Sequence, residues 1–198
     1  MTFPILETKR LRLIEINQTY SQNIYDIFSL EEVTRYYGMN PFKEVEQAVR
    51  MVDSFAKNFQ EKRAIRWGIV VKETDDFVGT VGFNNLQLWS KRAEIGYDIH
   101  PVFWRKGYAS EAVKVVLAYG FQEIDLFRVG AITYPENKAS SYLLLKLGFQ
   151  KEGLLRGYIY QGNQSNDALV YSILKTDWEK KRFKTNPSLR MQNDKKIK

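Results

Sequence analysis

The chain has 198 residues, of which 44% are hydrophobic and 14% aromatic, with no cysteine, one histidine and a formal net charge of +7. This composition is typical of one folded domain; it excludes disulfides, thiolate metal sites and a cysteine nucleophile, and it disfavours a histidine-based metal cluster or triad, so we expect no metal. No apolar run reaches the roughly 20 residues of a membrane span, and the first ten residues lack a signal-peptide layout, so we expect a cytoplasmic protein.

The first half of the chain alternates between helical and extended patterns. Residues 10–16 alternate charged and apolar side chains, which predicts a strand, and residues 17–30 favour a helix. An amphipathic helix is indicated by the i, i+3, i+4, i+7 spacing of Val45, Ala48, Val49, Val52, Phe55 and Phe59. Three runs rich in β-forming residues follow, at 64–71, 77–89 and 93–99. The short polar turns between them predict an antiparallel meander.

The second half alternates strand and helix more regularly. The patterns predict a helix at 107–124, a strand at 128–134, a helix from the N-cap Asn137 to the C-cap Gly148, and strands at 149–160 and 168–174. The order β-α-α-β-β-β-α-β-α-β-β indicates one α/β domain over residues 1–174. We expect a mixed, mostly antiparallel sheet of about seven strands flanked by about four helices.

The positive charge is concentrated at the C-terminal end. Residues 175–198 contain nine Lys or Arg and three Asp or Glu, a balance of +6, which leaves +1 for the first 174 residues. We therefore interpret 175–198 as a basic tail that is flexible and solvated. The alternative is a tail that contacts nucleic acid or another acidic surface, such as a ribosome.

A basic turn separates the third strand of the meander from the helix at 107–124. The first N–H groups of a helix lack intrahelical partners, and the helix dipole makes that end partly positive, so it favours anions. Gly107 allows a ligand to approach the backbone, and the small side chains of Ala109 and Ser110 leave space above the first turn. Arg105 and Lys106 add positive charge. The stretch is compatible with a phosphate site, although an ordinary basic turn is the simpler alternative.

The segment W-R-K-G-Y-A at 104–109 resembles the acetyl-CoA signature Q/R-x-x-G-x-G/A of the GCN5-related N-acetyltransferases (GNAT). Trp104 stands where the signature has Gln or Arg, a departure that is familiar in the RimJ/RimL-type ribosomal-protein N-terminal acetyltransferases. Three further segments resemble that branch: LETKRLRLIEI at 6–16, GTVGF at 79–83 and NKASSYLLLKLGFQKEGLLR at 137–156. The resemblance covers about residues 5–174.

This resemblance implies that the strands at 93–99 and 128–134 splay apart and receive the acetyl-pantetheine arm of acetyl-CoA. It implies a cofactor site formed by Ile99, His100, Val102, Arg105, Lys106, Gly107, Tyr108, Ala109, Ser110, Asn137 and Ser140. Asn137 is equally well interpreted as an ordinary helix cap. His100, which precedes Pro101, is better interpreted as a turn residue than as a catalytic group.

Without cysteine, an acyl-cysteine route is closed, and direct attack of an amine on the thioester in a ternary complex remains. Glu94 is the first candidate for the general base, and Asp98 on the same strand face is the second; either could instead be a structural strand residue. The resemblance implies that Ser140, or alternatively Tyr142, protonates the leaving thiolate. A structural role for Ser140 in the first turn of its helix stays open.

The sequence determines the acceptor of the acetyl group less well than the cofactor site. Trp67, Phe83, Trp89 and Tyr97 could line an acceptor pocket, although strand aromatics are often core residues. The resemblance favours a protein N-terminus, such as that of a ribosomal protein. A polyamine, aminoglycoside or amino-acid-like acceptor is the alternative, with Glu31, Glu32, Glu44 and Glu46 as possible polyamine ligands. A non-catalytic CoA-binding sensor is a further alternative. We expect a monomer or homodimer without membrane partners.

Overall fold

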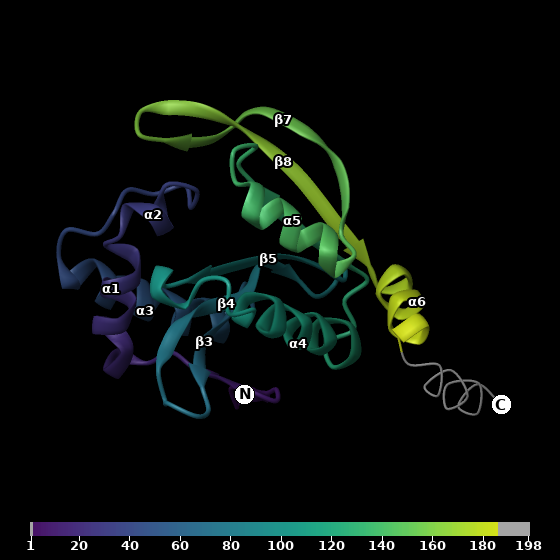
Figure 1. Cartoon of the computed structure of the whole chain (residues 1–198), viewed down its shortest axis with the longest axis horizontal. Coiled ribbons are helices and arrows are strands. Elements are labelled where there is room, and N and C mark those ends of the chain that lie inside the picture. Colours follow the sequence, from purple (N-terminus) through teal and green to yellow (C-terminus); the bar gives the residue numbers. More distant parts are fainter. Residues whose placement is uncertain (1, 186–198) are drawn as a thin grey trace.

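The computed structural model describes residues 2–185, which form eight strands and six α-helices around one sheet (Figure 1). The strands are β1 Leu6–Glu7, β2 Leu11–Glu15, β3 Ile65–Val71, β4 Phe77–Gln87, β5 Arg92–Ile99, β6 Arg128–Thr133, β7 Gln150–Gln161 and β8 Gln164–Leu174. The helices are α1 Ser21–Phe28, α2 Glu31–Thr34, α3 Val45–Gln60, α4 Tyr108–Gln122, α5 Lys138–Leu147 and α6 Lys175–Thr185, with 3-10 turns at Gln18–Tyr20 and Pro101–Phe103.

The predicted fold class and the antiparallel meander are confirmed, with small differences in the number of elements. The additional elements are β1, with two residues, α2, with four residues, and α6. The first two are too short to show a hydrophobic period, and α6 has a charged sequence without a clear apolar face. None of the helices in the described part of the chain is long and apolar enough to cross a bilayer.

The sheet has the order β1-β2-β3-β4-β5-β6-β8-β7, and its neighbouring strands are antiparallel except for β5 and β6. These two run parallel and pair only from Arg92 with Arg128 to Glu94 with Gly130. Beyond that point β5 continues beside β4 to Ile99, and β6 continues beside β8 to Thr133. The predicted splay therefore begins at Glu94, and it leaves facing backbone groups of both strands unpaired with each other.

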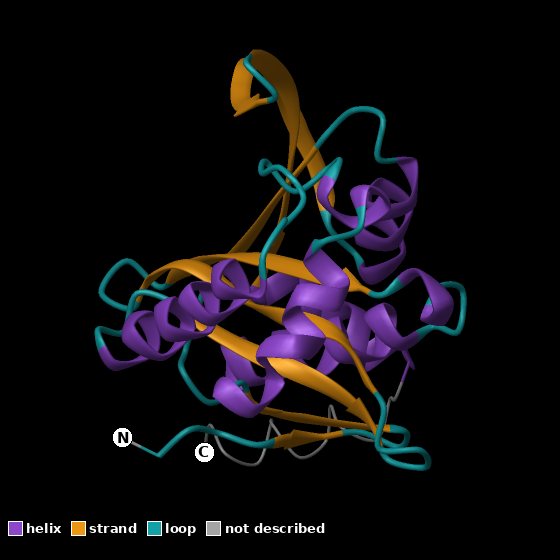
Figure 2. Cartoon of the chain, turned by 90° about the vertical axis from the view of Figure 1, so that its left-hand side faces the viewer, coloured by secondary structure: helices purple, strands orange, loops and turns teal. Residues whose placement is uncertain are grey.

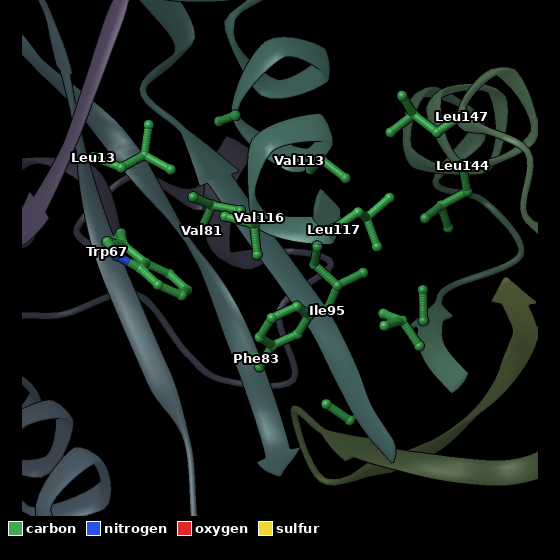
Figure 3. Packing of buried hydrophobic residues seen from close by; sticks show 14 of the residues in the cluster. Leu13, Trp67, Val81, Phe83, Ile95, Val113, Val116, Leu117, Leu144 and Leu147 are labelled. Atoms are coloured by element: carbon green, nitrogen blue, oxygen red, sulfur yellow. The ribbon is translucent and has the colours of Figure 1, made fainter. Parts of the chain in front are cut away.

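The two faces of the sheet are covered by different helices (Figure 2). Alternate residues such as Trp67, Val81 and Ile95 belong to a core with Val113 and Val116 of α4 (Figure 3). The intervening positions face α1 and α3, where Ile24, Phe28, Ala48 and Val52 belong to a second cluster. The side-chain alternation of β5 consequently presents its odd-numbered residues to α4 and its even-numbered residues to the α1 and α3 layer.

The first part of the basic segment, Lys175–Thr185, forms α6 directly after β8. Trp178 of this helix packs against the main core, with its ring centre 5.4 Å from that of Phe121. An aromatic contact of this kind adds buried apolar area that charge composition does not reveal. The rest of the expected tail, 186–198, lies outside the described residues.

Candidate active site

A cavity of about 910 Å³ lies where β5 and β6 separate. Consecutive residues from Glu94 to Ile99 all line it, so the opening reaches both faces of the sheet. One part, here called the α4 side, is formed by Tyr97, Arg105, Gly107, Tyr108, Ala109, Ser110, Asn137 and Ser140, among others. The other part, the α2 side, is formed by Glu32, Arg35, Tyr36, Tyr37, Phe55, Arg66, Asn84, Glu94 and Asp98.

The N-terminus of α4 opens into the cavity without a side-chain cap. Gly107 is the N-cap and has a left-handed φ of 80°, and the preceding Arg105 also has a positive φ, 62°. By contrast, α3 begins with a capping box, and Asn137 caps α5 by accepting from the Ser140 backbone N–H at 3.1 Å. The first-turn amides of α4 therefore have no side-chain acceptor, and at the cavity they could donate to an anionic group.

Trp104 holds the end of β5 against this turn. Its indole Nε1 donates to the backbone oxygen of Ile99 at 2.6 Å. A tryptophan at this signature position therefore has a local structural role, because its bond to Ile99 fixes the splayed strand relative to the turn before α4.

Arg10 braces the same turn from β2's N-terminal end. Its guanidinium donates to the backbone oxygen of Lys106 at 2.9 Å and to Oε2 of Glu111 at 2.7 Å, and it lies 4.8 Å from the Tyr108 ring centre. The other carboxylate oxygen of Glu111 accepts from the hydroxyl of Thr8 and from the Arg10 backbone N–H. This network is not among the features predicted from the sequence, and T-x-R in the first segment is its visible signal.

Two hydroxyl groups meet on the α4 side. The phenol of Tyr97 and the hydroxyl of Ser140 are 2.8 Å apart and share a hydrogen bond. Burial raises the pKa of Tyr97 to about 12, so the phenol stays protonated at neutral pH. The backbone of Ser140 has the expected capping bond to Asn137, while its side chain remains available to the cavity. Both interpretations of Ser140 are therefore compatible.

Glu94 is half-buried at the point where the splay begins, on the α2 side. Its Oε2 accepts from Asn85 Nδ2 at 2.9 Å, and no described residue donates to Oε1. One carboxylate oxygen is therefore free to accept a proton from a ligand in the cavity.

Asp98 is buried further along the same face. Its Oδ1 accepts from the Thr80 backbone N–H at 3.1 Å, its Oδ2 accepts from the Thr80 hydroxyl at 2.6 Å, and Arg66 Nη1 lies 4.0 Å from Oδ2. Burial raises the pKa of Asp98 to about 6, although Arg66 and the Thr80 hydrogen bonds oppose this shift. Asp98 is thus held by structural partners on both oxygens.

Arg66 is a site residue that the sequence analysis missed. It is only 5% exposed, and it donates to the Gly96 oxygen at 3.1 Å and to Asn84 Oδ1 at 3.0 Å. A Cβ at position 96 would lie 3.2 Å from Arg66 Nη2, so glycine leaves the space that the guanidinium occupies. The signal was an arginine inside the otherwise apolar run AIRWGIVV.

A splayed parallel strand pair, an uncapped helix after a W-R-K-G-Y-A turn, and a pair of hydroxyl groups meet at one cavity. A family model for the acetyltransferase (GNAT) domain matches residues 10–150. The chain belongs to the GNAT acetyltransferase family. It is an acetyl-CoA-dependent N-acetyltransferase. Within the described residues, no group of His, Asp or Glu side chains could hold a metal ion.

Related proteins match nearly the whole domain of this GNAT acetyltransferase. A Bacillus subtilis protein named uncharacterized N-acetyltransferase YoaA is 50% identical over 173 residues, covering 87% of this chain and 98% of the relative. A solved GNAT-family acetyltransferase from Bacillus anthracis has a TM-score of 0.77 at 27% identity, covering 87% of this chain and 99% of that one. The [ribosomal protein uS5]-alanine N-acetyltransferase of Escherichia coli is 29% identical over 129 residues, which are 65% of each chain.

The GNAT acetyltransferase cavity contains many, but not all, of the predicted cofactor residues. Ile99, Arg105, Gly107, Tyr108, Ala109, Ser110, Asn137 and Ser140 line it. Val102 is 65% exposed and does not line the cavity, and His100 instead accepts from the Val102 backbone N–H in the 3-10 turn. The Lys106 ammonium lies 5.0 Å from the Phe103 ring centre, outside the cavity wall. A 3-10 turn directs successive side chains around its axis, so only some of them reach the site.

Four of the predicted site residues do not line the cavity, each for a clear physical reason. Trp67 and Phe83 are fully buried in the α4 core, since strand alternation directs them to that face (Figure 3). Trp89 is 87% exposed in the β4–β5 turn, at the opposite end of β5 from Ile99. Tyr142 is 70% exposed. It follows Ser140 by two residues, and this spacing rotates its side chain by about 200° around the helix axis, away from the direction of Ser140. Of the predicted aromatics, Tyr97 lines the cavity.

Proposed function

We propose that this acetyltransferase modifies the N-terminal α-amine of a protein. The observation that carries the proposal is the charge balance of the α2 side, where Glu32, Glu94 and Asp98 are accompanied by Arg35 and Arg66. A polyamine has further cationic groups that would meet these two guanidinium groups. A peptide N-terminus presents one amine followed by neutral amide groups, which suits a mixed polar and aromatic wall.

The predicted polyamine ligands support the same choice. Of the four glutamates considered, Glu32 lines the cavity. Glu44 accepts from the first turn of α3 in a capping box, and Glu46 lies in that same turn. Dispersed carboxylates of this kind do not provide the clustered negative charge that a polyamine needs.

We infer a direct transfer in which the two sides of the cavity have separate tasks. The amine nitrogen attacks the thioester carbonyl, the C–N bond forms and the C–S bond breaks. Glu94 on the α2 side takes the proton from the amine, and the Ser140 hydroxyl on the α4 side, paired with Tyr97, gives a proton to the departing thiolate. Exchange with solvent then removes the proton from Glu94 and returns one to Ser140, so that both groups are restored. An α-amine needs less help than a lysine, because its pKa is lower by about 2.5 units, or about 3 kcal/mol.

A turnover screen with acetyl-CoA tests the acceptor. Peptides with a free N-terminal alanine or serine, the same peptides with a blocked N-terminus and an internal lysine, and spermidine would be compared by thiol release and mass spectrometry. The proposal expects acetylation of the free α-amine with the highest kcat/KM. Preferred modification of spermidine or of the internal lysine would overturn it.

The second candidate is a small-amine acetyltransferase. The spermidine N(1)-acetyltransferase of Escherichia coli is 27% identical over 150 residues, covering 76% of this chain and 78% of that enzyme. Glu32, Glu94 and Asp98 are the carboxylates that such an acceptor would use. Because of this relative, the turnover screen would also include small amines such as aminoglycosides.

Contact with a ribosome through the basic C-terminal segment is a separate proposal. Removing 175–198 would also remove α6 and the contact of Trp178 with Phe121. A loss of ribosome binding in that form could therefore result from a less stable domain and not from the missing basic residues. Removing 186–198 alone leaves that contact in place. Unchanged ribosome co-sedimentation of this shorter form would argue against the role.

A further inference from the structure

We propose that Gln161 is a positioning residue that holds residues 31–39 over the α2 side of the cavity and thereby sets acceptor binding. This inference rests on the proposed function, because it assigns the α2 side to the acceptor. The segment supplies Glu32, Val33, Arg35, Tyr36 and Tyr37 to the cavity wall. Whatever fixes the segment therefore fixes the shape of this wall.

The side-chain amide of Gln161 contacts the segment at three backbone positions. Nε2 donates to the Thr34 oxygen at 3.0 Å and to the Met39 oxygen at 2.7 Å, while Oε1 accepts from the Gly38 N–H at 3.1 Å. Oε1 also accepts from the hydroxyl of Tyr134, which follows β6. One side chain thus joins the α2 segment to the far wall of the splay.

The chemistry of these partners determines the orientation of the amide. Backbone carbonyls can only accept and a backbone N–H can only donate, so the NH₂ group must face Thr34 and Met39, and the oxygen must face Gly38. Both donors and both acceptor positions are satisfied. A side chain that lacks either the two donors or the oxygen cannot reproduce the arrangement.

Within the described residues, Gln161 provides the hydrogen bonds that connect this segment to the chain beyond Leu30. Apart from the helical bonds to Leu30 and within the segment, every hydrogen bond between residues 31–39 and another part of the described chain ends on Gln161. The remaining contacts are apolar or aromatic, such as Tyr36 with Tyr134, whose ring centres are 5.7 Å apart, and Tyr37 with Phe28. A four-residue helix has little stability of its own, so these bonds determine where the segment lies.

The β7–β8 hairpin carries Gln161 to this position. The two strands extend as a long arm beyond α5 (Figure 1). Pairing is irregular between Leu155 and Ile159, where the chain contains Gly157 with a φ of 60°. A bulge bends and twists a strand, which here directs the end of the arm over α2. Ile159 then lies close to Gly38, with 3.6 Å between its Cγ2 and a Cβ built on that glycine.

The experiment compares Gln161→Leu and Gln161→Glu with Gln164→Leu. Gln161→Leu removes all four bonds, whereas Gln161→Glu keeps the acceptor oxygen but directs a carboxylate at two carbonyls. Gln164 is the exposed cross-strand partner of Gln161 and serves as the matched control. Two quantities would be measured: amide hydrogen exchange of residues 31–39, and the separate KM values for acetyl-CoA and for a peptide with a free N-terminal alanine.

Both Gln161 variants are expected to speed exchange across 31–39 and to raise the peptide KM about tenfold, since hydrogen bonds that order the wall are lost. The KM for acetyl-CoA should stay within about twofold, because the α4 side has its own braces. Unchanged exchange, an unchanged peptide KM, or an equal rise in both KM values would each overturn the inference. If Gln161→Leu does not fold, Gln161→Glu carries the test. If the wild type leaves the peptide unmodified, the proposed function fails, while exchange still decides whether Gln161 holds the segment.

Discussion

The hydroxyl groups of Tyr97 and Ser140 share a hydrogen bond of 2.8 Å across the opening between two separated parts of the fold. Tyr97 lies on β5 beyond its last pair with β6, and Ser140 lies in the first turn of α5. This bond directs a protonated phenol and a serine hydroxyl toward the same side of the cavity. Base and acid candidates consequently occupy opposite faces of the splayed sheet.

Ser140→Ala is expected to lower kcat by about tenfold to a hundredfold, since the leaving thiolate loses its proton donor. The KM for acetyl-CoA should change little. Steady-state kinetics with Ser141→Ala as the neighbouring control measure the effect; the Ser141 hydroxyl is buried with no hydrogen-bond partner in the described chain and does not line the cavity. Equal losses in the two variants would assign Ser140 a role in the helix rather than in the chemistry.

Glu94→Gln is expected to reduce kcat by about a hundredfold, because an amide cannot take the amine proton. Asp98→Asn should reduce it much less, since both oxygens of Asp98 are already engaged by Thr80. The comparison requires kcat and kcat/KM across pH for both variants. A larger loss in Asp98→Asn, together with loss of an acidic limb near pH 6 in kcat/KM, would assign the base to Asp98 instead.

Gly107→Glu is expected to weaken CoA binding by at least about a hundredfold, because it places a carboxylate at the anion-binding end of α4. Gly107→Asn is the matched control, since asparagine tolerates a φ of 80° and adds no charge. Isothermal titration with CoA measures the dissociation constant, and circular dichroism checks the fold. CoA affinity in the Glu variant equal to that of the Asn variant would refute the prediction of a phosphate site at the N-terminus of α4.

Arg10→Ala is expected to weaken CoA binding about tenfold although Arg10 lies behind the turn, because the Lys106 carbonyl and Glu111 lose their brace. Arg12→Ala, two residues further along in β2, is the control, since its partner is the exposed Asp75 and such surface pairs contribute little. Both are measured by the same titration. Similar CoA affinities for the two variants would show that the turn holds its shape without Arg10.

Asp98 should make the folded state more stable at mildly acidic pH. Its folded pKa, about 6, lies above the ordinary value of 3.8, so the folded state binds a proton in this range that the unfolded chain does not. The stabilisation is present at low pH and is lost as the pH rises through 6. The free energy of unfolding, measured with denaturant, should be about 1 to 1.5 kcal/mol higher at pH 5 than at pH 7.5 because of Asp98. This contribution should be absent in Asp98→Asn. An identical pH dependence in the variant would contradict the raised pKa.

Sequence alone determined those features that depend on neighbouring residues. The antiparallel meander follows from apolar runs and short polar turns, and the uncapped N-terminus of α4 follows from a turn, Gly107 and a helix in direct succession. The family could be identified because its motifs are short ordered segments. Local backbone chemistry is sufficient for such features, since each of them involves only a few consecutive residues.

Tertiary structure decided the features that join distant residues. Arg66 with Asp98, Arg10 with Glu111, Tyr97 with Ser140 and Gln161 with Thr34 are separated by many positions along the chain. Strand alternation indicates two faces but not which helix covers each, so Trp67 could not be assigned to the core in advance. Helical spacing excludes Tyr142 from the cavity wall only once the direction of the Ser140 side chain is known. These contacts depend on how the sheet separates and how the β7–β8 arm bends, and both follow from packing of the whole domain.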